Sequence, residues 1–220
     1  MRLPPLRPRR RSAAAKAYRT AKPPAAETPW RRARYAVVDL ELTGLDSRHD
    51  EIVSFASVPI EDGRVTVSGI RAAKVRPARM PSGETIRIHG LRPMDLAEAP
   101  TLPEVMDVIL EALAGRTIIA HVAWVERGFL GEALRSAGVR LAEPVLDTAL
   151  LARHVIGAGR DGNREMTLSD AARRLGLPVH RPHVAEGDAL TTAQLFLALA
   201  SRLDRAEPQT VGSLARLSRL

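Results

Sequence analysis

Short apolar stretches alternate with turn signals in the first half of the chain, and this pattern predicts β-strands. Residues 34–42 and 51–60 are dominated by apolar and β-branched positions, and each predicts one strand. Residues 64–75 alternate between polar and apolar positions, and the pair Asp62 and Gly63 before them is a hairpin turn signal. We therefore expect three antiparallel strands at the start of the folded domain.

The second half of the chain follows the helical period, with apolar residues recurring every three or four positions. Residues 101–114 predict a helix, with Thr101 as its N-cap and Gly115 as its stop signal. A wholly apolar strand follows at 117–121, as expected in a sheet covered on both faces. Further helices are predicted at about 124–137, 147–156, 168–175 and 186–203. This order predicts an α/β domain whose mixed central sheet has three antiparallel strands, then parallel strands, flanked by helices.

Composition divides the chain into three parts. Residues 1–33 are rich in Pro, Arg and Ala and lack a hydrophobic period, so we expect a disordered basic tail. This tail accounts for the net charge of +8. The folded domain should occupy residues 34–204, and residues 205–220 form a short C-terminal segment. A basic tail attracts nucleic-acid phosphates, but a solvated extension or a transit peptide can have the same composition.

The residues that the sequence lacks exclude several classes of protein. The chain has no cysteine, which rules out disulfides, thiolate metal sites and a cysteine nucleophile. No apolar run approaches the roughly 18 residues of a membrane span, and the sequence has no apolar region of a secretory signal. We therefore expect a cytoplasmic protein without a membrane partner.

Two acids interrupt the apolar strand in residues 37–46, which read VVDLELTGLD. Alternate residues of a strand share a face, so Asp39 and Glu41 point the same way. Their charges repel each other, and a divalent cation bound between them would remove the conflict. Thr43 and Gly44 end the strand, which places both acids at the edge where open α/β sheets bind ligands. The alternative is a solvated strand face that carries two acids.

A third acid, Glu126, lies on the apolar stripe of a predicted helix. Phe129 and Leu130 follow three and four residues later and share its face. A carboxylate on a buried stripe is costly unless it has a partner such as a metal ion. The alternative is a first-turn glutamate that the helix dipole favours.

His183 and Asp188 complete the set of candidate residues. Five residues correspond to about 140° around a helix, so the two side chains cannot face one site from the same helix. A helix that starts near Glu186 would leave His183 in the preceding loop, where it can fold over the site that Asp188 enters. The alternative for His183 is a surface loop histidine.

Together these motifs resemble those of the DEDDh, or DnaQ-like, family of 3′–5′ exonucleases, which have a ribonuclease H-like fold. The resemblance extends over residues 34–203. It rests on three motifs, DLELTGL at 39–45, AHVAWVERGFL at 120–130 and HVAEGD at 183–188. Two further segments are similar to family segments, RIHGL at 87–91 and LDTALLAR at 146–153.

The chain departs from the family pattern within the first two motifs. Leu42 stands where the family has Thr, Val122 where it has Asn, and Val125 where it has Phe. Glu126 replaces the family's Asp, which keeps the charge and lengthens the side chain by one methylene. Carboxylates of either length can ligate a hard divalent cation directly or through water.

The resemblance implies a nuclease site with two Mg²⁺ or Mn²⁺ ions. Four carboxylates would hold these ions, those of Asp39, Glu41, Glu126 and Asp188. His183 would act as the general base that takes the proton of the attacking water. The terminal nucleotide would contact the backbone of Leu42 and Thr43 and the side chains of Leu45, His89 and Phe129.

The implied reaction releases 5′-nucleoside monophosphates from single-stranded 3′ ends, with DNA slightly favoured over RNA. The implied partners are nucleic acid with such an end and, in a complex, a polymerase or repair protein. Two alternatives stay open, a catalytically weakened nucleic-acid-binding or scaffold protein and a proofreading subunit of a polymerase complex. The apolar residues of 209–220 could dock on such a partner or pack on their own domain.

Overall fold

A six-stranded mixed sheet forms the centre of the computed structural model, which describes residues 12–157 and 166–219. Strand β1 (Tyr35–Leu42) lies in the middle, antiparallel to β2 (Ile52–Glu61) and parallel to β5 (Thr117–Ala120). Strand β6 (Val145–Asp147) pairs in parallel with β5 at one edge. The mixed sheet agrees with the prediction, although the short β6 was not predicted as a strand.

The third antiparallel strand differs from its prediction because it is divided into two pieces. Strands β3 (Arg64–Val65) and β4 (Arg71–Lys74) both pair with β2, and the 3₁₀ turn Val67–Gly69 separates them. The carbonyl of Pro59 accepts a hydrogen bond from the N–H of Thr66. Proline has no N–H, so it cannot donate the second hydrogen bond of an antiparallel pair to Thr66. The ladder therefore breaks at this point.

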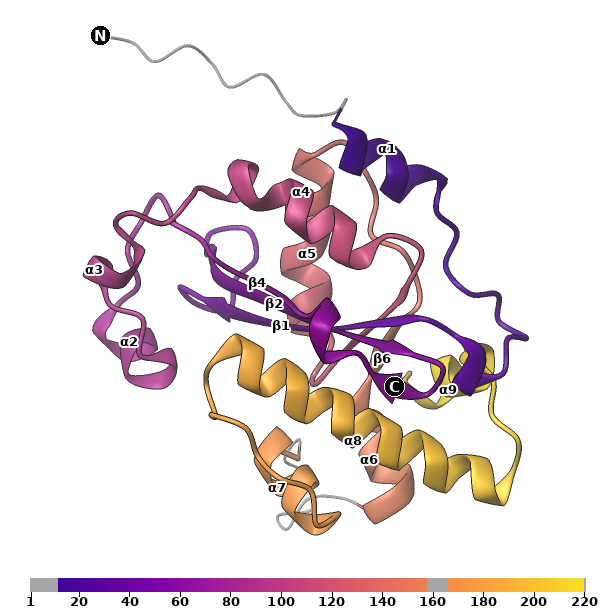
Figure 1. Ribbon diagram of the computed structural model, residues 1–220. Coiled ribbons are helices and arrows are strands. Elements are labelled where there is room, and N and C mark those ends of the chain that lie inside the picture. The colour runs from indigo at the N-terminus through magenta and orange to yellow at the C-terminus, as the bar shows by residue number, and fades with distance from the viewer. Residues whose placement is uncertain (1–11, 158–165, 220) are drawn as a thin grey trace, which may run out of the picture.

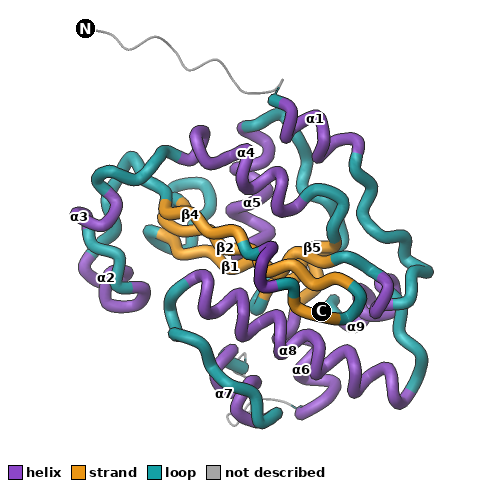
Figure 2. The backbone as a smooth tube through the Cα atoms, viewed as in Figure 1, coloured by secondary structure: helices purple, strands orange, loops and turns teal. Residues whose placement is uncertain are grey.

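Helices cover both faces of the sheet (Figure 1). One layer holds α1 (Ala13–Thr20), α4 (Leu102–Leu113) and α5 (Trp124–Ser136). The other holds α6 (Thr148–Ile156), α7 (Leu168–Arg174), α8 (Ala185–Ala206) and α9 (Val211–Leu217). The short helices α2 (Gly83–His89) and α3 (Pro93–Leu96) lie to one side of the sheet (Figure 2). No helix in these described ranges is long and apolar enough to cross a membrane.

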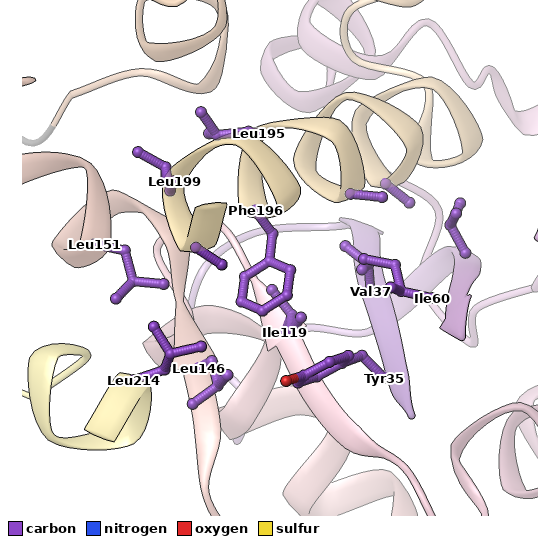
Figure 3. Close-up of a cluster of buried hydrophobic side chains, with 14 of the residues drawn as sticks. Tyr35, Val37, Ile60, Ile119, Leu146, Leu151, Leu195, Phe196, Leu199 and Leu214 are labelled. Carbon is purple, nitrogen blue, oxygen red and sulfur yellow. The ribbon is translucent and has the colours of Figure 1, made fainter. Parts of the chain in front are cut away.

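The two faces of β1 pack into separate apolar clusters. Tyr35 and Val37 belong to the cluster around α8, where the ring of Phe196 lies 4.9 Å from that of Tyr35 (Figure 3). Ala36 and Val38 belong to the cluster around α4 and α5. By the same alternation, Asp39 and Glu41 point to the α8 side of the sheet. The packing of β1 thus decides which helix layer the two acids meet.

Helix α4 begins and ends where the sequence predicts. The Glu104 carboxylate accepts from the backbone N–H of Thr101 at 2.7 Å and from its hydroxyl at 2.7 Å. Gly115, which follows the helix, has a φ of +66°, a conformation that glycine adopts without strain.

Residues 12–33 differ from the expected disordered tail. Ala14, Ala15 and Tyr18 of α1 are buried in the cluster around α4, and Trp30 is 1% exposed in the cluster around α8. The Tyr18 hydroxyl donates to the carbonyl of Arg140 and accepts from the N–H of Ala142, both at 3.0 Å. The buried face of α1 is built largely from alanine, which gives only a weak signal in a segment rich in Pro and Arg. Residues 1–11 of the predicted tail lie outside the described residues.

The C-terminal segment packs on its own domain over the described residues. Val211 and Leu214 of α9 join the cluster around α8. The N–H of Val211 donates to the carbonyl of Thr28 at 3.0 Å, and the N–H of Trp30 donates to the carbonyl of Gln209 at 3.2 Å. The boundary expected after residue 204 falls inside α8, which continues to Ala206.

Candidate active site

The loop after β1 is held by hydrogen bonds that fix the end of the strand. The Thr43 hydroxyl donates to Asp50 Oδ1 at 3.1 Å and accepts from the N–H of Glu51 at 2.9 Å. Asp50 Oδ2 accepts from the N–H of Asp46 at 3.0 Å. A Cβ on Gly44 would lie 2.4 Å from the Asp50 carboxylate, so a larger residue would displace the Asp50 side chain from these hydrogen bonds. This loop therefore holds the end of β1 in a defined position behind its two acids.

Three carboxylates meet on the α8 side of the sheet. Asp39 and Glu41 from β1 and Asp188 from the first turn of α8 place one oxygen each within 4.8 Å of one another. Asp39 and Asp188 are partly buried and Glu41 is buried. Such a group of hard oxygen donors is suited to a divalent cation such as Mg²⁺ or Mn²⁺.

Burial and mutual repulsion disfavour the charged forms of these acids when no cation is bound. Burial raises the pKa of Asp39 well above its usual range, and the charges of Glu126, Glu41 and Asp188 raise it further. Burial and the charge of Asp188 raise the pKa of Glu41 to about 7. Burial also raises the pKa of Asp188, against the N–H of His183, which lowers it. A bound cation would favour all of the charged forms together.

Glu126 lies just outside this group of three. It occupies the first turn of α5, is 5% exposed, and shares its buried face with Phe129 and Leu130. Its Oε2 atom is buried without a hydrogen-bond partner among the described residues. Burial, with smaller contributions from the charges of Asp147 and Glu41, raises the pKa of Glu126 to about 8. A buried carboxylate oxygen without a partner is suited to a cation ligand.

His183 lies in the loop before α8, as the sequence predicts. Its backbone N–H donates to Asp188 Oδ2 at 2.8 Å, and its φ of +61° turns the chain sharply into the helix. The side chain is exposed and lines a cavity of about 290 Å³ together with Glu41. The imidazole is therefore at the border between the acids and solvent.

His89 lines the same cavity and is buried. Its Nδ1 accepts from the N–H of Leu91 at 3.0 Å, which leaves the ring proton on Nε2. That Nε2 atom has no hydrogen-bond partner within the described part of the chain. Burial lowers the pKa of His89, against the backbone of Leu42, which raises it. His89 thus forms part of the cavity wall beside Glu41, with its Nε2 atom buried.

The other residues expected to contact substrate lie in different surroundings. Leu42 is buried at the end of β1, Thr43 holds the loop described above, and Leu45 is 65% exposed on that loop. Phe129 is 4% exposed in the cluster around α4 and lines a separate cavity of about 510 Å³. The structure therefore does not bring Phe129 to the cavity beside Glu41, because its ring packs in the core with Leu130 on the buried face of α5.

Several residues at the site were not singled out from the sequence. Ser54 pairs with Glu41 in β1 and with Lys74 in β4, so the three lie in one row across the sheet and line the 290 Å³ cavity. Asp147 accepts hydrogen bonds from three backbone N–H groups around the start of α5 and α6. The alternation of residues along the strands could have indicated that Ser54 and Lys74 share a face with Glu41. The Asp-Thr pair at the start of a predicted helix could have indicated Asp147.

The sheet, its helix layers and the carboxylates near the end of the central strand β1 define the class of protein. The family model named RNase_T and described as "Exonuclease" matches residues 36–196. The chain belongs to this exonuclease family, and its fold is ribonuclease H-like, as the sequence motifs predict.

Individual relatives agree with this assignment. A DNA polymerase III subunit epsilon-like protein of Rhodobacter capsulatus is 33% identical over 192 residues, 86% of this chain and 27% of that protein. DNA polymerase III subunit epsilon of Aquifex aeolicus is 26% identical over 170 residues, 77% of this chain and 81% of that protein. A structure of exonuclease X with 5′ overhanging duplex DNA superposes with a TM-score of 0.63 and 22% identity, covering 84% of this chain and 99% of that one. This chain spans only 11–27% of the length of several longer curated relatives.

Proposed function

We propose that this protein is a metal-dependent 3′–5′ exonuclease that releases 5′-nucleoside monophosphates from single-stranded ends. The observation that carries the proposal is the group of three carboxylate oxygens within 4.8 Å of one another, near the buried Glu126 carboxylate, whose Oε2 has no partner among the described residues. A binding role for divalent cations would explain why these acids are gathered together, since no salt bridge among the described residues neutralises them.

The four acids divide naturally between two ions, Mg²⁺ or Mn²⁺. Asp39, Glu41 and Asp188 would share one ion, and Glu126 would complete the site of the other with Asp39, whose pKa its charge raises. When bound, two ions lower the pKa of a water and stabilise the attacking and leaving oxygens of a displacement at phosphorus. Binding as carboxylates requires that all four side chains be ionised.

His183 would take the proton of the attacking water. Its backbone is tied to Asp188, which fixes the loop relative to the acids, while the ring stays free to move at the cavity border. A neutral imidazole accepts a proton at ordinary pH, as a general base must. We propose this role for His183.

The 290 Å³ cavity would receive the terminal nucleotide. His89 would line its pocket, the backbone of Leu42 and Thr43 would contact its sugar, and Leu45 would pack on a base. Discrimination between DNA and RNA depends on how this cavity treats a 2′-hydroxyl. We propose DNA as the preferred substrate, in keeping with the DNA-bound exonuclease X structure.

The test is degradation of 5′-labelled single-stranded DNA and RNA by the purified protein with Mn²⁺, Mg²⁺ or EDTA. A metal-dependent ladder that shortens from the 3′ end, and is absent for Asp188→Ala, would support the proposal. Asp170→Ala removes an exposed acid of α7 and serves as the matched control, because it should leave the ladder unchanged. No shortening by a folded protein would contradict it.

One observation favours the second candidate, a catalytically weakened nucleic-acid-binding protein. Glu126 is longer than the aspartate of the family motif, and it stands outside the group of three acids. Glu126→Asp separates the two candidates, because the variant should be faster than the natural chain only if Glu126 holds the ion poorly. A cytoplasmic location and a polymerase partner are also proposed, the latter because relatives are named as polymerase III subunits.

A further inference from the structure

The turn that leads from β5 into α5 has an unusual backbone. Val122 has a φ of +62°, in the left-handed region. A β-branched side chain is rare there, while glycine and asparagine adopt it readily. The conformation at Val122 therefore needs support from its surroundings.

The carboxylate of Asp147 supplies that support. Oδ1 accepts from the N–H of Val122 at 3.1 Å and from the N–H of Ala149 at 2.8 Å, and Oδ2 accepts from the N–H of Ala123 at 2.9 Å. Asp147 pairs with Ala120 across the parallel strands β5 and β6, so its side chain reaches the turn from the neighbouring strand. Because these oxygens already bind three donors, Asp147 is a poor candidate for a fifth metal ligand.

The direction of α5 at its start decides where Glu126 lies. Ala123 is the residue before the helix, and Glu126 is the third residue within it. The buried Glu126 carboxylate can meet Asp39 only if this first turn keeps its direction. A change of the turn by a small angle would move the carboxylate away from the other acids, because no described hydrogen bond holds its Oε2.

We propose that Asp147 is a positioning residue, which holds the Val122 turn in its left-handed form and thereby directs Glu126 toward Asp39 and Glu41. This inference rests on the proposed function, in which Glu126 helps to hold the second ion. Asp147 acts through the backbone and does not touch the reacting atoms. Its removal should weaken the binding of one ion more than it slows the reaction at saturating metal.

The experiment measures Mn²⁺ binding to the full chain by calorimetry, beside the Mn²⁺ concentration that gives half-maximal nuclease activity. For Asp147→Ala we expect the second ion to bind about 10–100-fold more weakly. This is the usual loss of affinity when a residue that supports a metal ligand is removed. Thr101→Ala, which removes a cap of α4, is the control for a general loss of stability. It should lower the melting temperature and leave both metal readouts unchanged.

A rescue variant makes the test specific to the turn. Glycine adopts a φ of +62° without the carboxylate, so Val122→Gly added to Asp147→Ala should recover most of the lost Mn²⁺ affinity. If Asp147→Ala does not fold, Asp147→Ser, which can still cap α6 but is too short to hold the turn, provides the same comparison. Wild-type Mn²⁺ affinity in Asp147→Ala or Asp147→Ser would overturn the inference and leave the proposed function intact. A natural chain that binds no Mn²⁺ and degrades no strand would overturn both.

Discussion

The two ends of strand β1 bury polar groups in opposite ways. At the start, the Tyr35 hydroxyl donates to the carbonyl of Trp30 at 2.9 Å, and its ring packs on Phe196. At the other end, Asp39 and Glu41 face further acids, and burial raises their pKa values. One end therefore contributes stability, whereas the other carries a local loss of stability that protonation or a bound cation relieves.

The largest expected effect comes from removing one charge at the acidic end. Asp39→Asn should lower nuclease activity by roughly 10³–10⁴-fold, because bound ions contribute several kcal/mol to the transition state. The same variant should melt at a higher temperature than the natural chain in EDTA, because it removes repulsion among buried acids. Activity above a tenth of the natural level would show that this cluster is not the reaction site.

A substitution at the apolar end of β1 should lower stability and leave the nuclease activity almost unchanged, the opposite of Asp39→Asn. Phe196→Ala should lower the free energy of unfolding by about 3–5 kcal/mol, because it leaves a cavity between Tyr35 and Trp30. Urea unfolding measures this change, and Val67→Ala, at a 67% exposed side chain, is the control. Activity per folded molecule should stay near that of the natural chain, and a large loss would mean that the two ends are coupled.

Stability in EDTA should fall as the pH rises from about 4.5 to about 8. The folded pKa values of Glu41 and Glu126, about 7 and about 8, lie above the ordinary value of 4.5, so the folded state binds more protons in this window. The contribution is fully present below 4.5 and is lost as each group ionises. Melting temperatures across this range should fall less steeply for Glu126→Gln, and added Mn²⁺ should raise them most at pH 8. Equal slopes for both proteins would contradict the shifted pKa of Glu126.

The smallest effect should come from the buried Tyr35 hydroxyl, which already has a hydrogen-bond partner. Tyr35→Phe removes one buried hydrogen bond and should cost about 1 kcal/mol of unfolding free energy. Chemical denaturation can resolve this difference, and nuclease activity should not change. A cost several times larger would mean that the hydroxyl fixes the position of Trp30 as well.

The sequence predicts the features that depend on nearby residues. Strand alternation places Asp39 and Glu41 on one face, and the N-cap and the terminal glycine define α4 within a residue. It does not predict α1, whose buried face is largely alanine, or the three-residue strand β6. Contacts between distant residues, such as Asp147 with Val122, follow only from the sheet order.

The pairing of residues 26–30 with residues 209–212 affects where the chain can be cut. Pro29 forms a β-bridge with Thr210, and the carbonyl of Ala26 accepts from the N–H of Gly212 at 2.8 Å. A fragment that begins at Arg34, where composition first suggests a boundary, would lose Trp30 and leave these backbone groups of the last helix unpaired. Such a fragment should aggregate or be degraded, whereas one that begins at Ser12 keeps every contact of this pairing. The smallest folding unit therefore includes a segment that composition alone would discard.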